Sequence, residues 1–278
     1  MGTVRNLSRL VAGLVLSMVV MASSAFAQQA SDQIAPERDS GITNKALVHA
    51  RTRMVVAANP LAAEAGLQVL RDGGSAADAA VAVQTVLGLV EPQSSGLGGG
   101  AFLIWYDAAT GALTTFDGRE TAPASATPDL FRDKDGKSVD FFDAVVGGRS
   151  VGTPGVPRLL ETVHRKYGKR PWADLFSPAI KLAEEGFRVS QRLNSLITAD
   201  AGRLHNEASV PFFTYDGAPL PVGAVLRNPD YAATLKAIAV GGADAFYKGA
   251  VAKQIVDAVS SHPTNPGGLA LSDLARAR

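Results

Sequence analysis

The chain has 278 residues, 46% of them hydrophobic, and a formal net charge of +1. It contains no cysteine, which excludes disulfides, cysteine nucleophiles and thiolate metal sites. No run of basic residues indicates a nucleic-acid partner, and stability must come from a large hydrophobic core.

The N-terminus is typical of an export signal. Two arginines precede the apolar run Leu10–Met21, which is too short to span a membrane, and Ala25-Phe-Ala follows as a cleavage pattern. No basic cluster follows the run, which argues against the alternative of a membrane anchor. We therefore expect a signal peptide over 1–27, a flexible lead-in over 28–45, and a periplasmic or secreted protein after cleavage near Ala27.

Chain breakers and apolar runs predict the elements of the first half. Met54–Ala57 is a short apolar run that favours a buried strand. Asn59-Pro predicts the cap and first residue of a helix that ends at Gly73-Gly. Ser75, with an acidic residue three positions on, predicts a capping box. The helix that it opens includes Ala79–Val90, which is apolar enough to be buried on most sides.

A hairpin and then a mainly helical half follow. Ala101–Tyr106 and Leu113–Phe116 read as two strands joined through Asp107–Gly111, and Arg119 lies just past the second strand. Helical periodicity recurs over Pro157–Tyr167, Pro178–Glu185, Pro229–Val240 and Val251–Ser261, with C-caps at Gly186 and Gly241 and another helix opening over Ser272–Ala277.

Searches for known chemistry exclude several kinds of site. The four histidines have no second ligand at helical spacing, so no metal site is expected. Ser95 precedes a glycine but lacks the G-x-S-x-G elbow of a serine hydrolase. Gly96–Gly100 follows a helix and precedes a strand, the reverse of a dinucleotide loop. We interpret it as a turn where backbones approach too closely for side chains.

Arg119 is the candidate binding residue. A guanidinium at the end of a strand can bind a carboxylate through two hydrogen bonds. From the residues alone, the favoured alternative is a structural salt bridge with Asp117 or Glu120.

The chain resembles the γ-glutamyltransferases over about Lys45 to Arg278. The matching segments, in the family's order, are Met54–Gly66, Leu70–Ala82, Gly96–Phe102, Asp117–Ala124, Val151–Val156, Ala179–Phe187, Ala245–Gly249 and Gly267–Ala275. The resemblance implies an α+β fold, namely the four-layer αββα fold of N-terminal-nucleophile hydrolases. It makes 46–278 a large-subunit region with a helical second half, truncated at its C-terminal end and incomplete as a fold.

The family resemblance also implies a reaction. Such enzymes are precursors that cut themselves in two, and the new N-terminal threonine of the small subunit attacks the γ-glutamyl amide to form an acyl-enzyme. Water then gives hydrolysis, and an amino acid or dipeptide acceptor gives transfer. Glutathione and other γ-glutamyl compounds are the implied donors, the small subunit is the implied partner, and no cofactor or nucleic acid is implied.

Within that family pattern, Arg119 matches the arginine that holds the α-carboxylate of the γ-glutamyl group. Gly118 departs from the frequent Phe-Arg-Glu, which we expect to loosen the arginine's presentation, and we read Glu120 as structural. No catalytic residue is assigned in this chain, because the family's threonine lies beyond Arg278, and neither Thr153 nor Thr264 replaces it.

Two alternatives stay open. Instead of the large-subunit region of a γ-glutamyltransferase, the chain is an inactive truncated fragment, at most an arginine-centred binding fragment, or part of a related cephalosporin or other amide acylase. A chain that ends at Arg278 would lack much of the core of this fold, so we expect Ala79–Val90 and the 101–116 hairpin to expose apolar faces, with aggregation as the consequence.

We predict that purified Gln28–Arg278 does not hydrolyse a γ-glutamyl anilide, because no residue in it is assigned to attack the amide. Release of the chromogenic aniline measures this. Turnover above that of a boiled sample would contradict the prediction.

Overall fold

The computed structural model describes residues 47–204 and 210–277. The predicted signal peptide over 1–27 and the predicted lead-in over 28–45 lie outside the described residues, so both stay predictions. No helix among the described residues is long and apolar enough to cross a membrane.

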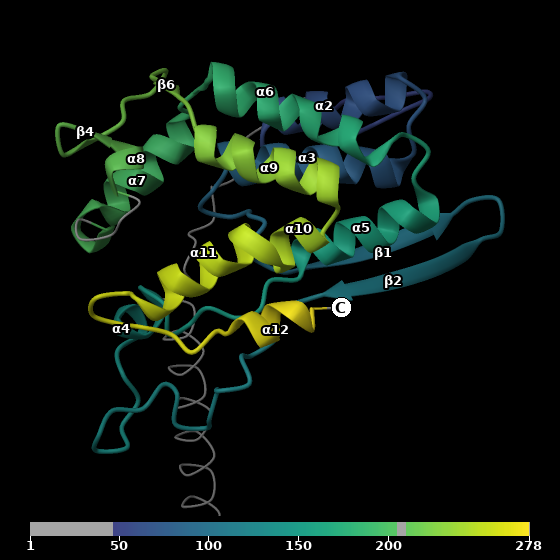
Figure 1. Cartoon of the computed structure of the whole chain (residues 1–278). Coiled ribbons are helices and arrows are strands. Elements are labelled where there is room, and N and C mark those ends of the chain that lie inside the picture. The colour runs from purple at the N-terminus through teal and green to yellow at the C-terminus, as the bar shows by residue number, and fades with distance from the viewer. Residues whose placement is uncertain (1–46, 205–209, 278) are drawn as a thin grey trace, which may run out of the picture. The chain divides into compact units, whose positions relative to one another are not determined.

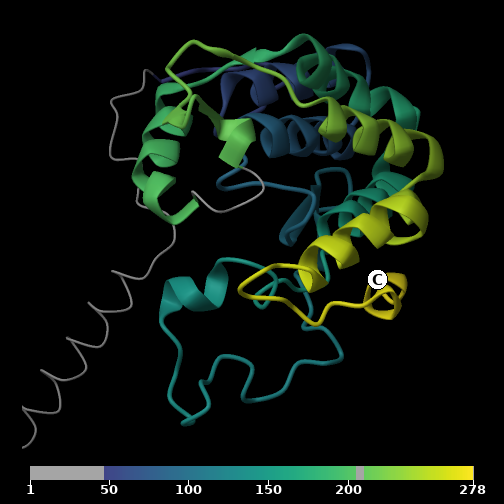
Figure 2. The same cartoon turned by 60° about the vertical axis from the view of Figure 1, so that its left-hand side comes forward.

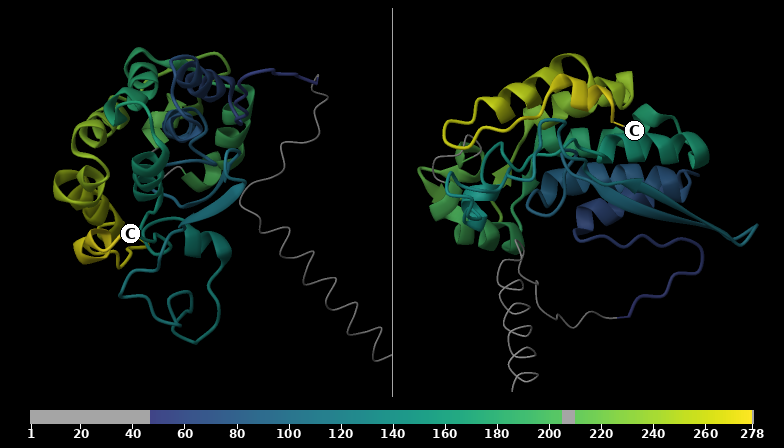
Figure 3. Two further views of the ribbon diagram at one scale, coloured as in Figure 1. Left: turned by 90° about the vertical axis from the view of Figure 1, so that its right-hand side faces the viewer. Right: turned by 90° about the horizontal axis from the view of Figure 1, so that it is seen from below.

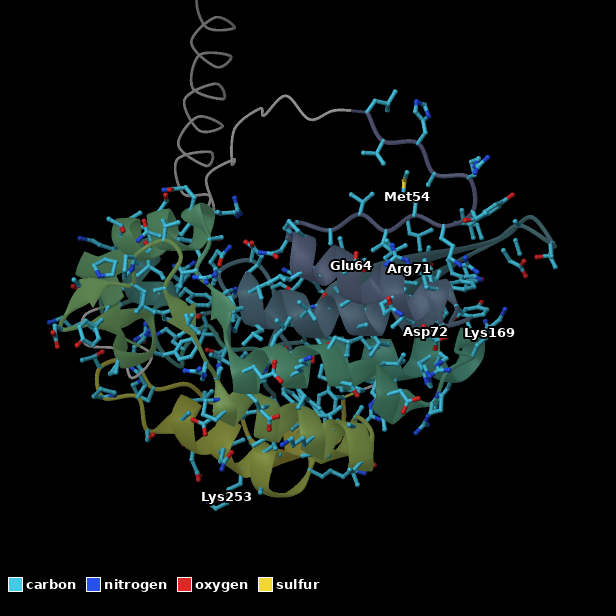
Figure 4. All side chains as sticks on the ribbon, turned by 90° about the horizontal axis from the view of Figure 1, so that it is seen from above. Met54, Glu64, Arg71, Asp72, Lys169 and Lys253 are labelled. Atoms are coloured by element: carbon cyan, nitrogen blue, oxygen red, sulfur yellow. The ribbon has the colours of Figure 1, made fainter. Side chains whose placement is uncertain are left out.

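Helices α2 (Pro60–Arg71) and α3 (Ala76–Val90) begin as predicted. Asn59 caps α2 by accepting from the Leu61 N–H at 3.0 Å. Ser75 and Asp78 form the capping box of α3, each side chain accepting from the other residue's N–H. Figure 4 shows Glu64 and Arg71 on α2, where they form an ion pair at 2.7 Å.

The predicted strand at Met54–Ala57 is wrong. The segment is extended but pairs with no strand among the described residues. Val55 packs against α2 near Gly66, whereas Met54 and Val56 are exposed. An apolar run alone cannot say whether a partner strand is present.

Helix α3 is the centre of the core. It packs against α2, α5 (Val156–Tyr167), η1 (Trp172–Phe176) and α6 (Ser177–Glu185), and α6 packs in turn on α9 (Pro229–Gly241). No residue of Ala79–Val90 is exposed, so the expectation of a bare apolar face there is wrong. Helices of the chain's second half cover this segment, as Figure 1 shows.

The remaining elements are mostly short. They are α4 (Phe141–Val145), β3 (Phe187–Arg188), α7 (Gln191–Leu204), α8 (Val210–Phe213), β4 (Thr214–Tyr215), β5 (Ala218–Pro219), β6 (Val225–Leu226), α10 (Asp244–Tyr247), α11 (Gly249–Ser260) and α12 (Leu271–Ala275). The sequence did not predict α7. Helix α9 includes Gly241, and its C-cap with positive φ is Gly242 rather than the predicted Gly241.

Strands β1 (Ala101–Asp107) and β2 (Ala112–Gly118) form the predicted antiparallel hairpin. Its inner face places Leu103, Trp105 and Phe116 against α3 and α5, and Trp105 stacks on Tyr167 at 4.1 Å. Its outer face is exposed, with Phe102, Ile104, Tyr106 and Leu113 on it. Figure 3 shows the hairpin running beside the helices and extending beyond them. The expectation of an exposed apolar face is therefore correct for the hairpin.

Mixed helices and strands confirm the predicted α+β class. Among the described residues, the helices cover only one face of the hairpin sheet.

Gly118, the last residue of β2, is buried where the strand meets α5. A Cβ at this position would lie 2.6 Å from the Leu159 Cβ. The missing side chain of Gly118 therefore lets α5 pack directly on the strand, and the predicted loosening of Arg119 stays a prediction.

We predict that Gly118→Ala destabilises the chain by roughly 1–3 kcal/mol, the usual cost of overpacking a tight contact. Gly98→Ala is the control, because a Cβ there meets nothing within 4 Å. Urea denaturation of both variants measures the effect, and equal midpoints would contradict the tight packing at Gly118.

Candidate functional site

Arg119 follows β2 directly, as the sequence predicts. Its N–H donates to the Asp117 Oδ1 at 2.9 Å, which fixes its backbone, while its side chain is 64% exposed. Its Nη1 lies 2.7 Å from the Glu120 Oε2, although the two groups are not aligned as a hydrogen bond. The salt-bridge alternative is therefore present in the structure, with Glu120 as the partner.

Glu120 also lines a cavity. The cavity measures about 400 Å³ and is bounded by Gln84, Pro92, Ser94, Ser95, Gly96, Gly98, Gly99, Gly100, Glu120 and Val156. Its wall is mostly backbone and small polar side chains, which suits a polar ligand or a polypeptide segment. Arg119 is thus the immediate chain neighbour of a residue in the wall.

The glycine-rich turn is the predicted site of close approach. The Gly99 carbonyl accepts from the Gly155 N–H at 2.9 Å and from the Val156 N–H at 3.2 Å. A Cβ on Gly100 would lie 2.5 Å from the Glu120 Oε2. The glycines therefore let two other segments, the start of α5 and the residues after β2, lie directly against the turn.

The segment 152–155 contacts the chain on both sides of Arg119, at Gly118 and at Thr121. We call the residues from Arg119 to Ser125 the Arg119 loop. Thr121 and Thr153 form a β-bridge, with N–H···O distances of 3.3 and 2.8 Å. On the other side of Arg119, a Cβ at Gly155 would overlap the Gly118 carbonyl oxygen. Arg119 thus lies between two fixed backbone contacts.

The C-terminal segment supports the same loop further along. The Ala124 N–H donates to the buried Asp273 of α12 at 3.1 Å, and the Ser125 Oγ donates to the Gly268 carbonyl at 2.9 Å. The Asn265 Nδ2 donates to the carbonyls of Asp143, in α4, and of Val146, which follows it. Figure 2 shows this C-terminal segment beside α4.

A charged cluster links α5 to α10. Arg158 pairs with Glu161 at 2.9 Å and with Asp244 at 2.6 Å. Hydrogen bonds from Lys248 and Arg158 hold the pKa of Asp244 at about 2. Burial lowers the pKa of Arg158, but the hydrogen bond to Asp244 and the attraction of the nearby Asp244, Glu161 and Tyr247 together outweigh burial and raise that pKa overall. Both groups are charged at neutral pH, where their ion pair links the two helices.

The structure brings together no other catalytic constellation among the residues it describes. The Ser95 Oγ accepts from Gln84 at 2.8 Å, and no histidine of the described ranges pairs with it. His164 lies 3.4 Å from the buried Asp78, which also accepts backbone N–H groups at the start of α3 and after α5. No group of three or more metal-ligating side chains is found in the described residues.

Sequence reasoning missed the contacts that hold the loop. Thr121 and Thr153 are 32 positions apart in the chain, and neither residue type signals a bridge. The salt bridge of Glu120 with Arg119 is one that the sequence analysis predicts, whereas the place of Glu120 in the cavity wall is not predicted.

We predict that Arg119→Ala changes the free energy of unfolding by less than about 1 kcal/mol, because an exposed ion pair contributes little. Urea denaturation measures this. A loss well above that limit would make Arg119 a structural residue.

Comparisons with known proteins agree with the motifs. The family model described as gamma-glutamyltranspeptidase matches residues 62–278. The glutathione hydrolase proenzyme of Bacillus subtilis (strain 168) is 45% identical over 206 residues, which cover 74% of this chain and 35% of that protein. The chain thus spans about a third of that relative's length.

Solved structures have the same fold. The Helicobacter pylori gamma-glutamyltranspeptidase superposes with a TM-score of 0.79 and 33% identity, covering 84% of this chain and 66% of that one. A cephalosporin acylase from Bacillus halodurans gives 0.71 and 33%, covering 87% and 45%. The predicted fold of N-terminal-nucleophile hydrolases is therefore confirmed. On the family match and these likenesses, the chain belongs to the gamma-glutamyltranspeptidase family.

Proposed function

We propose that the chain is the large-subunit part of a glutathione hydrolase or γ-glutamyltransferase, in which Arg119 binds the α-carboxylate of the donor. The observation that carries the proposal is the exposed guanidinium of Arg119, on a backbone held from both sides and beside a polar cavity. The family match supports the choice of a γ-glutamyl donor.

The charge contacts of Arg119 leave room for a ligand. Glu120 approaches only Nη1, and the other guanidinium nitrogens have no partner within the described part of the chain. An exposed pair of this kind is worth about 0–1 kcal/mol, whereas a bidentate, charge-assisted contact is worth about 1.5–3 kcal/mol. A donor carboxylate therefore competes well against Glu120.

We assign the rest of the reaction to a small subunit of the same precursor. A small-subunit threonine would attack the γ-glutamyl amide and pass the acyl group to water, an amino acid or a dipeptide. Such a subunit needs a surface to pack on, and the exposed Phe102, Ile104 and Tyr106 of the hairpin offer an apolar one. The name proenzyme of the Bacillus subtilis relative fits a precursor that is processed.

The apolar N-terminal run and the alanine cleavage pattern support export, so we place the protein in the periplasm or outside the cell.

A cephalosporin or other amide acylase is the second candidate, which the likeness to the acylase from Bacillus halodurans favours. A γ-glutamyl group and a glutaryl group carry the same terminal carboxylate, so Arg119 suits both. The two substrates differ in the α-ammonium group, and only recognition of that group separates the two functions.

We predict that Arg119→Ala weakens glutathione binding by about 30- to 150-fold, the equivalent of roughly 2–3 kcal/mol. Titration of the chain followed by NMR measures the affinity. Arg132→Ala is the matched control, because Arg132 is also exposed and paired with a neighbouring carboxylate.

Equal affinities of the parent chain and Arg119→Ala would rule out the carboxylate role. A glutaryl amide that binds as tightly as glutathione would favour the acylase.

A further inference from the structure

Tyr247 is a buried residue that the proposed reaction does not use. It ends α10, is 1% exposed, and lies far in the sequence from the Arg119 loop. Its hydroxyl donates to the Pro154 carbonyl at 2.9 Å and accepts from the Arg158 N–H at 3.3 Å. One hydroxyl therefore satisfies a carbonyl before α5 and an unpaired N–H in the first turn of α5.

This contact replaces a missing cap. Gly155, the N-cap of α5, makes no side-chain capping bond, so the first turn needs a partner from elsewhere. Burial raises the pKa of Tyr247 to about 12, so the hydroxyl keeps its proton at neutral pH and can donate. The Arg158 guanidinium lies 5.0 Å above the Tyr247 ring and covers it.

Pro154 lies between Thr153 and Gly155, the two residues that contact the chain on either side of Arg119. Thr153 on one side bridges to Thr121, and Gly155 on the other packs against the Gly118 carbonyl. Both contacts flank Arg119. Movement of Pro154 would therefore shift the backbone on both sides of the guanidinium together.

We propose that Tyr247 is a positioning residue for Arg119: its hydroxyl fixes the Pro154 peptide, and through it the backbone that presents the guanidinium to a carboxylate. This inference rests on the proposed carboxylate-binding role of Arg119. A guanidinium must be well placed to make two hydrogen bonds to one carboxylate, so loss of the fixed backbone weakens binding rather than removing it.

Tyr247→Phe tests the role, because it keeps the ring and removes only the hydroxyl. Tyr231→Phe is the matched control. The Tyr231 hydroxyl donates to the Thr85 carbonyl at 2.8 Å, so the same kind of bond is lost in a different part of the core, between α9 and α3. Glutathione affinity is measured by NMR titration of the full chain, and the amide exchange of Thr121 and Thr153 is followed in the same samples.

We expect Tyr247→Phe to weaken binding about fivefold to tenfold, as the loss of one hydrogen bond would. We expect it to speed the exchange of the Thr121 and Thr153 amides, and Tyr231→Phe to do neither. In the Arg119→Ala background, Tyr247→Phe should have no further effect on affinity, because its effect passes through the guanidinium.

Equal losses of affinity in both tyrosine variants would overturn the proposal and make Tyr247 merely structural. A Tyr247→Phe effect that persists without Arg119 would also overturn it. An affinity that does not depend on Arg119 at all would overturn the proposed function instead, whatever Tyr247→Phe does.

Discussion

The site depends on two backbones that meet with no side chain between them. Gly118 ends β2 and Gly155 opens α5, and a Cβ at Gly155 would overlap the Gly118 carbonyl. Such close approach is possible only between glycines or similarly small residues. It brings α5 onto the hairpin and sets the direction in which the chain leaves the strand. Arg119 is the first residue after that contact, so its position follows from backbone packing more than from its own side chain.

The same constraint explains why Glu120 is a weak partner for Arg119. Glu120 lies against the glycine turn, where the missing side chain of Gly100 leaves room for its carboxylate. The carboxylate reaches only one nitrogen of the guanidinium. Glu120 therefore balances the charge of Arg119 but leaves most of the guanidinium's hydrogen-bond donors unused. A competing carboxylate needs those donors in order to bind.

Local signals in the sequence predicted the local structure well. The helix caps at Asn59 and Ser75 and the turn at Gly111 depend on residues only a few positions apart. The structure has the caps and the hairpin at those positions. The strand prediction for Met54–Ala57 is wrong because a strand needs a partner strand, and an apolar run does not reveal whether one is present. The hydrogen bond from Tyr247 to Pro154 joins residues 93 positions apart, and neither residue type predicts it. The position of Arg119 was predictable, but the contacts that fix it were not.

The hairpin joins two properties that are separate in the sequence. One face packs on α3 and α5 through Leu103 and Trp105, and the other presents Phe102 and Ile104 to solvent. A two-stranded sheet with one bare apolar face is marginal by itself, so a polypeptide that covers this face would stabilise the hairpin. Because β2 runs straight into Arg119, any such polypeptide would also lie next to the guanidinium. Packing of the proposed small subunit and completion of the binding site would then be one event, since the same strand carries both the apolar face and the arginine.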